Sequence, residues 1–261
     1  MWRPGTRPVT DDVGMRDDDA DAHGGGARPV GRFGLVGGIG PESTIAYYRL
    51  ILGEYRRRRP DGSAPPLLIS SIDLARMLAL VGAADPEPLT DYLAEEIRVL
   101  VDAGARWGAL ASNTPHVVFD AIQARVAIPL VSIVEVTCAA AREQGFRRLG
   151  LFGTASTMRG RFYPDIFSRS GIELVAPTPP EQAEIDAIYF SELVAGITRP
   201  ASRDRLVEIA RRLRDDTAID GLILGGTELP LILDEASQVG LPLLDTTRIH
   251  AVAIVDRMLS S

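Results

Sequence analysis

The chain has 261 residues, of which 46% are hydrophobic and 24% charged, so it can bury a sizeable core as one domain or two small ones. Its net charge of −7 argues against a nucleic-acid partner bound through phosphates, and no apolar run approaches the roughly 20 residues of a membrane helix. Because the start of the chain lacks the apolar region of a secretory signal, we expect a cytoplasmic protein without a membrane partner.

Residues 1–31 are rich in aspartate and glycine and predict a disordered leader. From residue 33 onwards, short apolar runs alternate with amphipathic helical stretches such as 91–103 and 202–215. The apolar runs lie at 33–36, 67–69, 108–111, 129–134, 149–152, 222–224 and 241–244. This alternation is typical of an α/β fold with buried parallel strands. A further helix is expected over 181–196, returning toward the first half of the chain.

Three short patterns occur twice, in the same order and at nearly one spacing. RFGLVG at 32–37 recurs as RLGLFG at 148–153, GALASNT at 108–114 as GLILGGT at 221–227, and IPL at 128–130 as LPL at 241–243. The repetition predicts two pseudo-symmetric lobes, 32–130 and 131–245, each with a parallel sheet flanked by helices, and a C-terminal helix over 246–261 that returns to the first lobe. Ligands of such sheets bind at the carboxyl ends of the strands, so the active site is expected in the cleft between the lobes.

The glycine-rich segment 37–44 follows one strand and opens a helix. Gly38 and Gly40 let the backbone approach a ligand, and a helix N-terminus favours an anion. The glycine spacing is not that of a dinucleotide site, so a small carboxylate or phosphate is a more natural ligand. A glycine-rich turn that only packs a helix on a sheet explains the segment equally well.

Four motifs together resemble the aspartate/glutamate racemase family: GGIGPEST at 37–44, ASNTPH at 111–116, LGGTELP at 224–230 and DTTRIHA at 245–251. The resemblance runs from about residue 33 to residue 258. It implies two α/β lobes with the active site between them, a small carboxylic-acid or amino-acid substrate, and chemistry without a cofactor. Members of that family use one cysteine in each lobe as paired bases at the carbon next to a carboxylate. We also expect a homodimer.

Both cysteine positions differ in this chain, where they are Ser112 and Gly226. A serine hydroxyl is a far weaker acid than a thiol, and glycine has no side chain, so we expect two-thiol racemisation to be lost. The single cysteine, Cys138, excludes a disulfide or multi-cysteine metal site and is interpreted as a buried structural residue. We therefore expect no metal. The chain has no lysine, which excludes Schiff-base chemistry on a side-chain amine.

Other residues must then carry the chemistry. His116 is the first candidate for an acid or base, because the ordinary pKa of histidine is near neutrality, although it could simply cap a helix. Glu228, and Glu135 at the end of the 129–134 strand, are bases if partly desolvated, or else partners of helix dipoles. The catalytic candidates are His116, Glu228 and Ser112. The substrate-binding candidates are Gly38, Gly40, Ser112, Asn113, Thr114, Thr154, Thr227 and Glu135.

Two questions stay open at the level of sequence. The resemblance implies a basic residue after the Gly-Thr of the second lobe, but Ala155 stands there, which leaves Arg76, Arg159 or Arg161 as partners of a carboxylate. Three functions also remain. The chain is an enzyme that uses non-thiol proton transfer for isomerisation, elimination or decarboxylation, a true amino-acid racemase with unorthodox bases such as His116 and Glu228, or a noncatalytic carboxylate-binding or regulatory protein.

Overall fold

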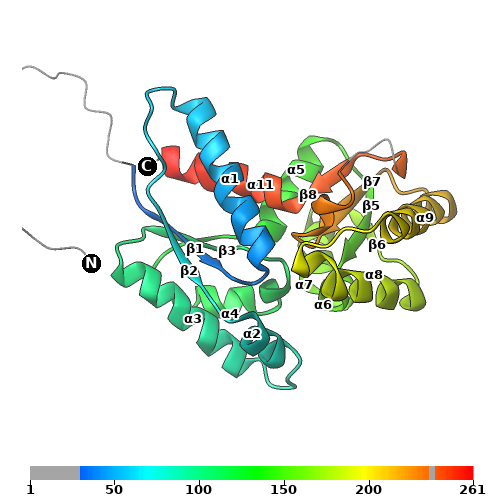
Figure 1. Cartoon of the computed structure of the whole chain (residues 1–261), viewed down its shortest axis with the longest axis horizontal. Helices are drawn as coiled ribbons and strands as arrows, with labels where there is room; N and C mark the ends of the chain where they lie inside the picture. The colour runs from blue at the N-terminus through cyan, green and yellow to red at the C-terminus, as the bar shows by residue number, and fades with distance from the viewer. Residues whose placement is uncertain (1–29, 235–238, 261) are drawn as a thin grey trace, which may run out of the picture.

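The apolar runs form two four-stranded parallel sheets, one in each half of the chain (Figure 1). A computed structural model describes residues 30–234 and 239–260. The first sheet has the order β2 (Leu67–Ser71), β1 (Phe33–Gly37), β3 (Trp107–Leu110) and β4 (Leu130–Val131). The second has the order β6 (Glu173–Val175), β5 (Arg148–Gly153), β7 (Gly221–Gly225) and β8 (Leu243–Asp245). The two orders are equivalent, so the predicted α/β fold of two related lobes is confirmed.

Helices cover both faces of the first sheet. Helix α1 (Pro41–Arg58) and the C-terminal helix α11 (Thr246–Leu259) pack on one face, where Tyr47 and Ile254 join a core with Leu35. The other face is covered by α2 (Leu74–Val81), α3 (Glu87–Asp102) and α4 (Phe119–Gln123). A 3₁₀ turn, η1 (Thr114–Val118), joins β3 to α4. Helix α11 also contacts α5 (Ile133–Glu143) of the second lobe, so α11 spans the junction between the lobes.

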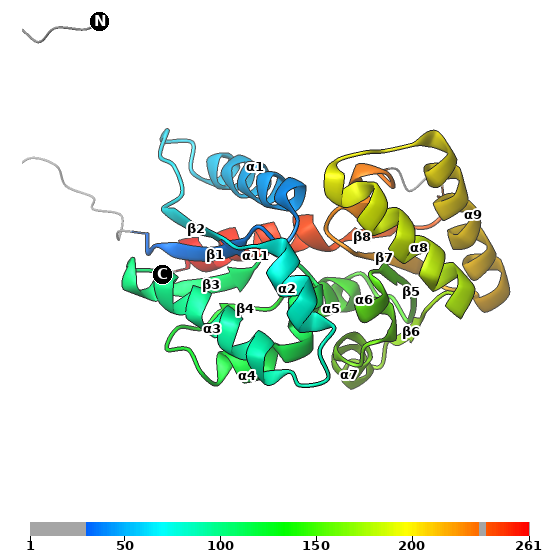
Figure 2. The ribbon, with the colours of Figure 1, turned by 60° about the horizontal axis from the view of Figure 1, so that its bottom comes forward.

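The second sheet is also covered on both faces (Figure 2). Helices α5 (Ile133–Glu143) and α7 (Phe162–Arg169) pack on one face. The other face carries α6 (Ala155–Arg159), α8 (Pro179–Ser191) and α9 (Pro200–Thr217), with the 3₁₀ turns η2 (Leu193–Ala195) and η3 (Leu229–Leu231). Within residues 30–234 and 239–260, no helix has the length and apolarity needed to cross a membrane.

Two sequence predictions were wrong in detail. The strand expected over 129–134 ends at Val131, because the side chain of Ser132 accepts a hydrogen bond from the backbone N–H of Glu135 at 3.3 Å and caps α5. The helix expected over 181–196 is α8, which ends at Ser191 and packs in the core of the second lobe through Ile185 and Tyr189. The expected range does return toward the first lobe at its end, where η2 contacts α1.

The short strand β6 was not predicted, since it has only three residues and its first, Glu173, is exposed. Most of the predicted leader, residues 1–29, lies outside the described residues. At its end, however, Gly31 is buried and Val30 packs against the core of the first lobe. Val30 and Gly31 therefore belong to the folded first lobe, although the composition assigns them to the leader.

Candidate active site

Polar residues follow the central strands of both lobes and meet at the junction. Residues 112–114 follow β3, Thr154 follows β5, and residues 226–228 follow β7. The hydroxyls of Thr114 and Thr154 form a hydrogen bond of 3.1 Å across the lobes, and both residues are buried. Ser112 is also buried, with 4% of its surface exposed. The repeated strand ends thus form one buried polar cluster between the lobes.

Asn113 is held by side chains from two helices, α11 and α7. Its amide donates to the hydroxyl of Thr246 at 3.2 Å, and its carbonyl oxygen accepts a hydrogen bond of 2.6 Å from the hydroxyl of Tyr163. Thr246 in turn donates to the carbonyl of Leu224 at 2.8 Å. The sequence analysis did not single out Tyr163, which reaches Asn113 from α7. These contacts orient the amide and also tie both lobes to α11.

Glu228 is almost completely buried, with 1% of its surface exposed. Its Oε2 accepts hydrogen bonds from the hydroxyls of Thr227, at 2.9 Å, and Tyr189. Its Oε1 has no hydrogen-bond partner. Burial raises the pKa of Glu228, whereas the hydrogen bonds from Tyr189 and Thr227 and the nearby hydroxyl of Ser43 act in the opposite direction. One oxygen is therefore fixed and the other is free to accept a proton.

The carboxylate of Glu228 lies against the glycine-rich segment of the first lobe. A Cβ added at Gly40 would lie 2.0 Å from Glu228 Oε1, and Gly40 has a φ of +116°, so only glycine fits there. Gly38, with a φ of +79°, donates its backbone N–H to the hydroxyl of Thr44 at 2.8 Å. The Gly38 N–H is therefore bonded within the glycine-rich segment. Gly40 is the residue of this segment that lies against Glu228 of the second lobe.

His116 lies on η1 with 4% of its surface exposed, and its ring stacks on Phe119 at 4.8 Å. Its Nε2 accepts a hydrogen bond of 3.2 Å from the backbone N–H of Ile133, so the neutral ring carries its hydrogen on Nδ1, which has no partner. Burial lowers the pKa of His116 to about 3, and the nearby His250 adds to this effect. In this arrangement His116 can donate a hydrogen bond but has no free nitrogen to act as a base.

A cavity of about 450 Å³ lies beside His116, between α3 and η1 of the first lobe and α5 and α7 of the second. Ser132, Glu135 and Arg161 are among its lining residues. Glu135 lies in the first turn of α5 and is exposed, rather than at the end of a strand. Of the predicted site residues, His116 and Glu135 line this cavity, whereas the buried strand-end residues do not.

The arginines proposed as carboxylate partners are spread over the molecule. The guanidinium of Arg76 stacks 4.2 Å from the ring centre of Tyr92, and Arg159 donates to Gln182 at 3.0 Å. Arg161 pairs with Asp165 at 2.8 Å and borders the cavity beside His116. Of the three, Arg161 is the one placed to meet a ligand entering there.

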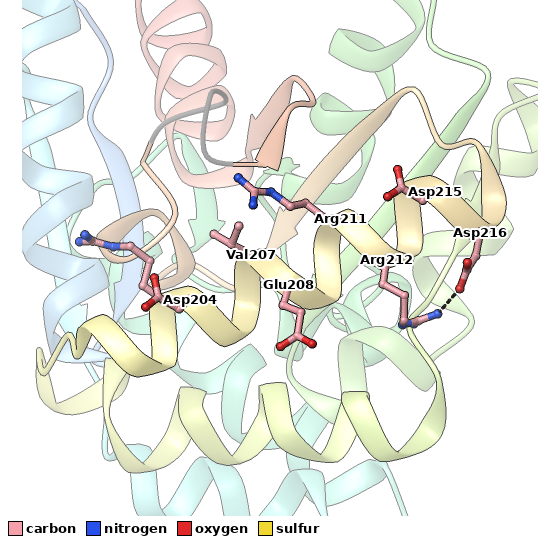
Figure 3. Close-up of a pocket in the computed structure, with 8 residues that line it drawn as sticks. Asp204, Val207, Glu208, Arg211, Arg212, Asp215 and Asp216 are labelled. Atoms are coloured by element: carbon pink, nitrogen blue, oxygen red, sulfur yellow. Dashed lines mark hydrogen bonds and ion pairs between the residues drawn. The ribbon is translucent and has the colours of Figure 1, made fainter.

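A second hollow, of about 760 Å³, lies on the outer face of α9 (Figure 3). Acidic residues and arginines alternate along it, and Arg212 pairs with Asp216 at 2.7 Å. Figure 1 places α9 at the end of the second lobe that faces away from the first. None of the predicted site residues lines this hollow, so we place the candidate site at the junction.

Three further residues have structural roles. Cys138 is buried on α5, where its thiol donates to the hydroxyl of Ser170 at 3.4 Å, as expected for a structural cysteine. His250 Nδ1 accepts a hydrogen bond of 2.7 Å from Tyr47, and its Nε2 donates to the carbonyl of Val131 at 3.0 Å. Asp245 caps α11 by accepting from the backbone N–H of Arg248. These residues position the elements around the junction.

Comparisons with known proteins agree with the fold and the motifs. The family model for Asp/Glu/Hydantoin racemase matches residues 36–254. A broad specificity amino-acid racemase of Bacillus subtilis is 22% identical over 232 residues, which cover 87% of this chain and 98% of that protein. The crystal structure of a candidate Asp/Glu racemase from Yersinia pestis is 31% identical, with a TM-score of 0.80 and coverage of 88% of this chain and 99% of the other.

An aspartate racemase homologue from Pyrococcus horikoshii is 32% identical, with a TM-score of 0.74. It covers 88% of this chain and 99% of its own. The similarity thus extends over both lobes, which share their strand order, and includes the motifs at the junction. The chain therefore belongs to the Asp/Glu/hydantoin racemase family.

Proposed function

We propose that this protein is a cofactor-independent enzyme that moves a proton at the carbon next to the carboxylate of a small carboxylic or amino acid. Glu228 acts as the base in place of a thiol. The observation that carries the proposal is the buried, unpaired Oε1 of Glu228, which lies beside Gly40 at the junction of the lobes. A carboxylate whose pKa is raised by burial is a stronger base than an exposed one.

The remaining residues bind the substrate and stabilise charge. Ser112 and Thr114 supply hydroxyl groups that can donate to a substrate carboxylate or to a developing enolate oxygen. The hydroxyl of Thr227, a predicted substrate-binding residue, instead donates to Glu228. The unpaired Nδ1–H of His116 supplies a neutral donor, which needs no proton transfer of its own. We assign His116 to oxyanion stabilisation rather than to proton abstraction.

The reaction follows from a site with one strong base. A single base that removes this proton supports isomerisation, when the proton returns to a neighbouring carbon, or elimination, when a leaving group departs from that neighbouring carbon. In a decarboxylation the bond to CO2 breaks instead, and the protonated carboxyl group gives its proton to the resulting carbanion. Racemisation needs a proton donor on the opposite face as well. Racemisation is the second candidate, because the Bacillus subtilis relative is an amino-acid racemase. For racemisation the hydroxyl of Ser112 would serve the other face, because both nitrogens of His116 are committed, Nε2 as an acceptor from Ile133 and Nδ1 as the site of the hydrogen.

The test is an assay in heavy water with L- and D-aspartate, L- and D-glutamate, malate and succinate, followed by NMR at the carbon next to the carboxylate. We expect conversion or hydrogen exchange of at least one acid, and a loss of roughly 10²–10⁴-fold in Glu228→Gln. Glu95→Gln, which changes an exposed carboxylate on α3, is the matched control.

Two outcomes count against the proposal. Aspartate racemisation by the wild type at ordinary enzyme rates favours the racemase reading. Thermal stabilisation by these acids, without exchange or conversion, indicates a binding protein.

A further inference from the structure

The space above Gly226 is filled by Tyr189. A Cβ added at Gly226 would lie 2.5 Å from Cε2 of the tyrosine ring and 3.3 Å from Cδ2 and Cζ. No side chain fits at residue 226 while the ring stays in place. The family resemblance implies that the second base stands at residue 226. In this chain the ring of Tyr189, from α8, occupies the space where that side chain would lie.

The hydroxyl of Tyr189 reaches the candidate base. It donates to Oε2 of Glu228, the oxygen that Thr227 also contacts. Because both donors act on one oxygen, the carboxyl group cannot turn without losing them, and Oε1 stays directed toward Gly40. The contact between the ring and Gly226 and the hydrogen bond to Glu228 are two separate constraints on the same side chain.

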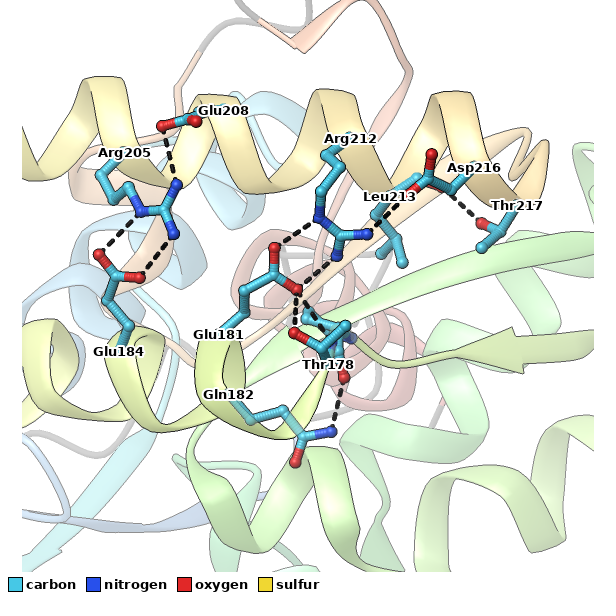
Figure 4. A network of polar contacts seen from close by, with 11 residues as sticks. Thr178, Glu181, Gln182, Glu184, Arg205, Glu208, Arg212, Leu213, Asp216 and Thr217 are labelled. Atoms are coloured by element: carbon cyan, nitrogen blue, oxygen red, sulfur yellow. Dashed lines mark hydrogen bonds and ion pairs between the residues drawn. The ribbon is translucent and has the colours of Figure 1, made fainter.

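Helix α8 is itself held firmly against α9 (Figure 4). Arg205 donates to both carboxylate oxygens of Glu184, at 2.8 and 2.9 Å, and Arg212 pairs with Glu181. Glu181 also accepts from Thr178 in a capping box at the start of α8. Paired contacts of this kind fix the helix from which the Tyr189 ring extends, and the ring is only 5% exposed.

We propose that Tyr189 is a positioning residue of the active site, which replaces the side chain missing at Gly226 and holds the Glu228 carboxyl group with one oxygen bound and one free. The part of Tyr189 in the reaction rests on the proposed function of Glu228. The effect of Tyr189 on the Glu228 carboxyl group does not depend on that function, so the positioning role and the proposed function can be tested separately.

The effect of Tyr189 on Glu228 has a definite sign. A hydrogen bond donated to a carboxylate favours its charged form, so removing the hydroxyl should raise the pKa of Glu228 further. The other groups that interact with this carboxyl are Thr227 on its own loop, and Ser43 and Tyr47 on α1. None of them changes in a Tyr189 variant.

The experiment measures the free energy of unfolding by urea from pH 4 to pH 9 for the wild type, Glu228→Gln, Tyr189→Phe and the double variant. The wild-type value minus that of Glu228→Gln should fall as pH rises above the pKa of an unfolded glutamate, and level off at the pKa of folded Glu228. The same difference, taken between Tyr189→Phe and the double variant, should level off at a pH about one to two units higher. Tyr55→Phe, a buried tyrosine on α1, is the control and should leave the profile unchanged.

An identical levelling point with and without the Tyr189 hydroxyl would overturn the proposal. If Tyr189→Phe does not fold, Gly226→Ala replaces it, because the added methyl group must displace the ring and should shift the profile in the same direction. If Tyr189→Phe shifts the pH at which the free-energy difference levels off, but the wild type converts none of the assayed acids, the result supports the positioning role and counts against the proposed function. If the wild type converts an acid but the levelling point does not shift, the result supports the proposed function and counts against the positioning role.

Discussion

At the scale of single residues, burial affects two titratable side chains of the junction in opposite ways. The pKa of Glu228 is raised and that of His116 is lowered, so both charged forms are disfavoured. Sequence alone pointed to both residues, since each follows a strand in a family motif. It could not assign their roles, because these depend on which atoms are already bonded: Nε2 of His116 is occupied, whereas Oε1 of Glu228 is not.

His116 should remain neutral over the physiological pH range. With a pKa of about 3, its ring stays uncharged well below pH 5, whereas an exposed histidine titrates near 6.5. We expect the ring carbon-bound proton signals of His116, assigned by comparison with His116→Gln, to stay constant in NMR spectra from pH 5 to pH 8. A titration near pH 6.5 would instead return His116 to the role of a general acid or base.

At the scale of elements, the glycines of α1 and the turn before it differ sharply in their surroundings. Gly40 at the helix start has a positive φ and touches Glu228, whereas Gly53 within α1 has open space around its Cα. Sequence reasoning identified the glycine-rich segment, but it could not foresee that a carboxylate from the other lobe would lie against Gly40.

Alanine substitutions at these two positions should therefore have opposite effects. Gly53→Ala should raise the free energy of unfolding by about 0.5–1 kcal/mol, because alanine is the better helix former and meets no neighbour. Gly40→Ala should lower it by more than about 1 kcal/mol, through backbone strain and contact with Glu228. Urea unfolding measures both, and equal effects would show that the contact with Glu228 is not made in solution.

The regular elements themselves were largely predictable. Strands β1 and β7 are buried along their whole length, and β5 is buried from Leu149 onwards, so their apolar runs stand out in the sequence. The 129–134 run was misassigned because apolar residues serve a buried strand and the buried face of α5 equally well. Tyr189 and Tyr163 were missed because neither lies in a repeated motif, and only the packing of α8 and α7 brings them to the strand ends.

At the scale of the whole molecule, the two lobes are closed on each other. Asn113, Thr114, Thr154 and Thr227 are all buried, so a substrate must enter while the lobes are apart or through the cavity beside His116. The hydrogen bond between Thr114 and Thr154 is one contact that any opening must break.

Thr114→Val should make opening more frequent, because it removes this contact with little change of shape. A hydrogen bond of roughly 1 kcal/mol corresponds to about a fivefold faster amide hydrogen exchange at residues 112–114 and 226–228. Thr217→Val is the control, since the Thr217 hydroxyl donates to the carbonyl of Leu213 within α9 at 2.5 Å, away from the junction. Equal exchange in both variants would indicate that the lobes do not separate at this contact.

The return of α11 to the first lobe also affects how the protein is made. Phe33, Tyr47 and Ile51 lie near the start of the described chain, yet Ile254, Val255 and Met258 complete their core. A ribosome therefore releases the first half of the molecule with an apolar face still uncovered, and that face is covered only after the final helix has been synthesised. We expect the nascent first lobe to depend on chaperones more than its size alone would suggest.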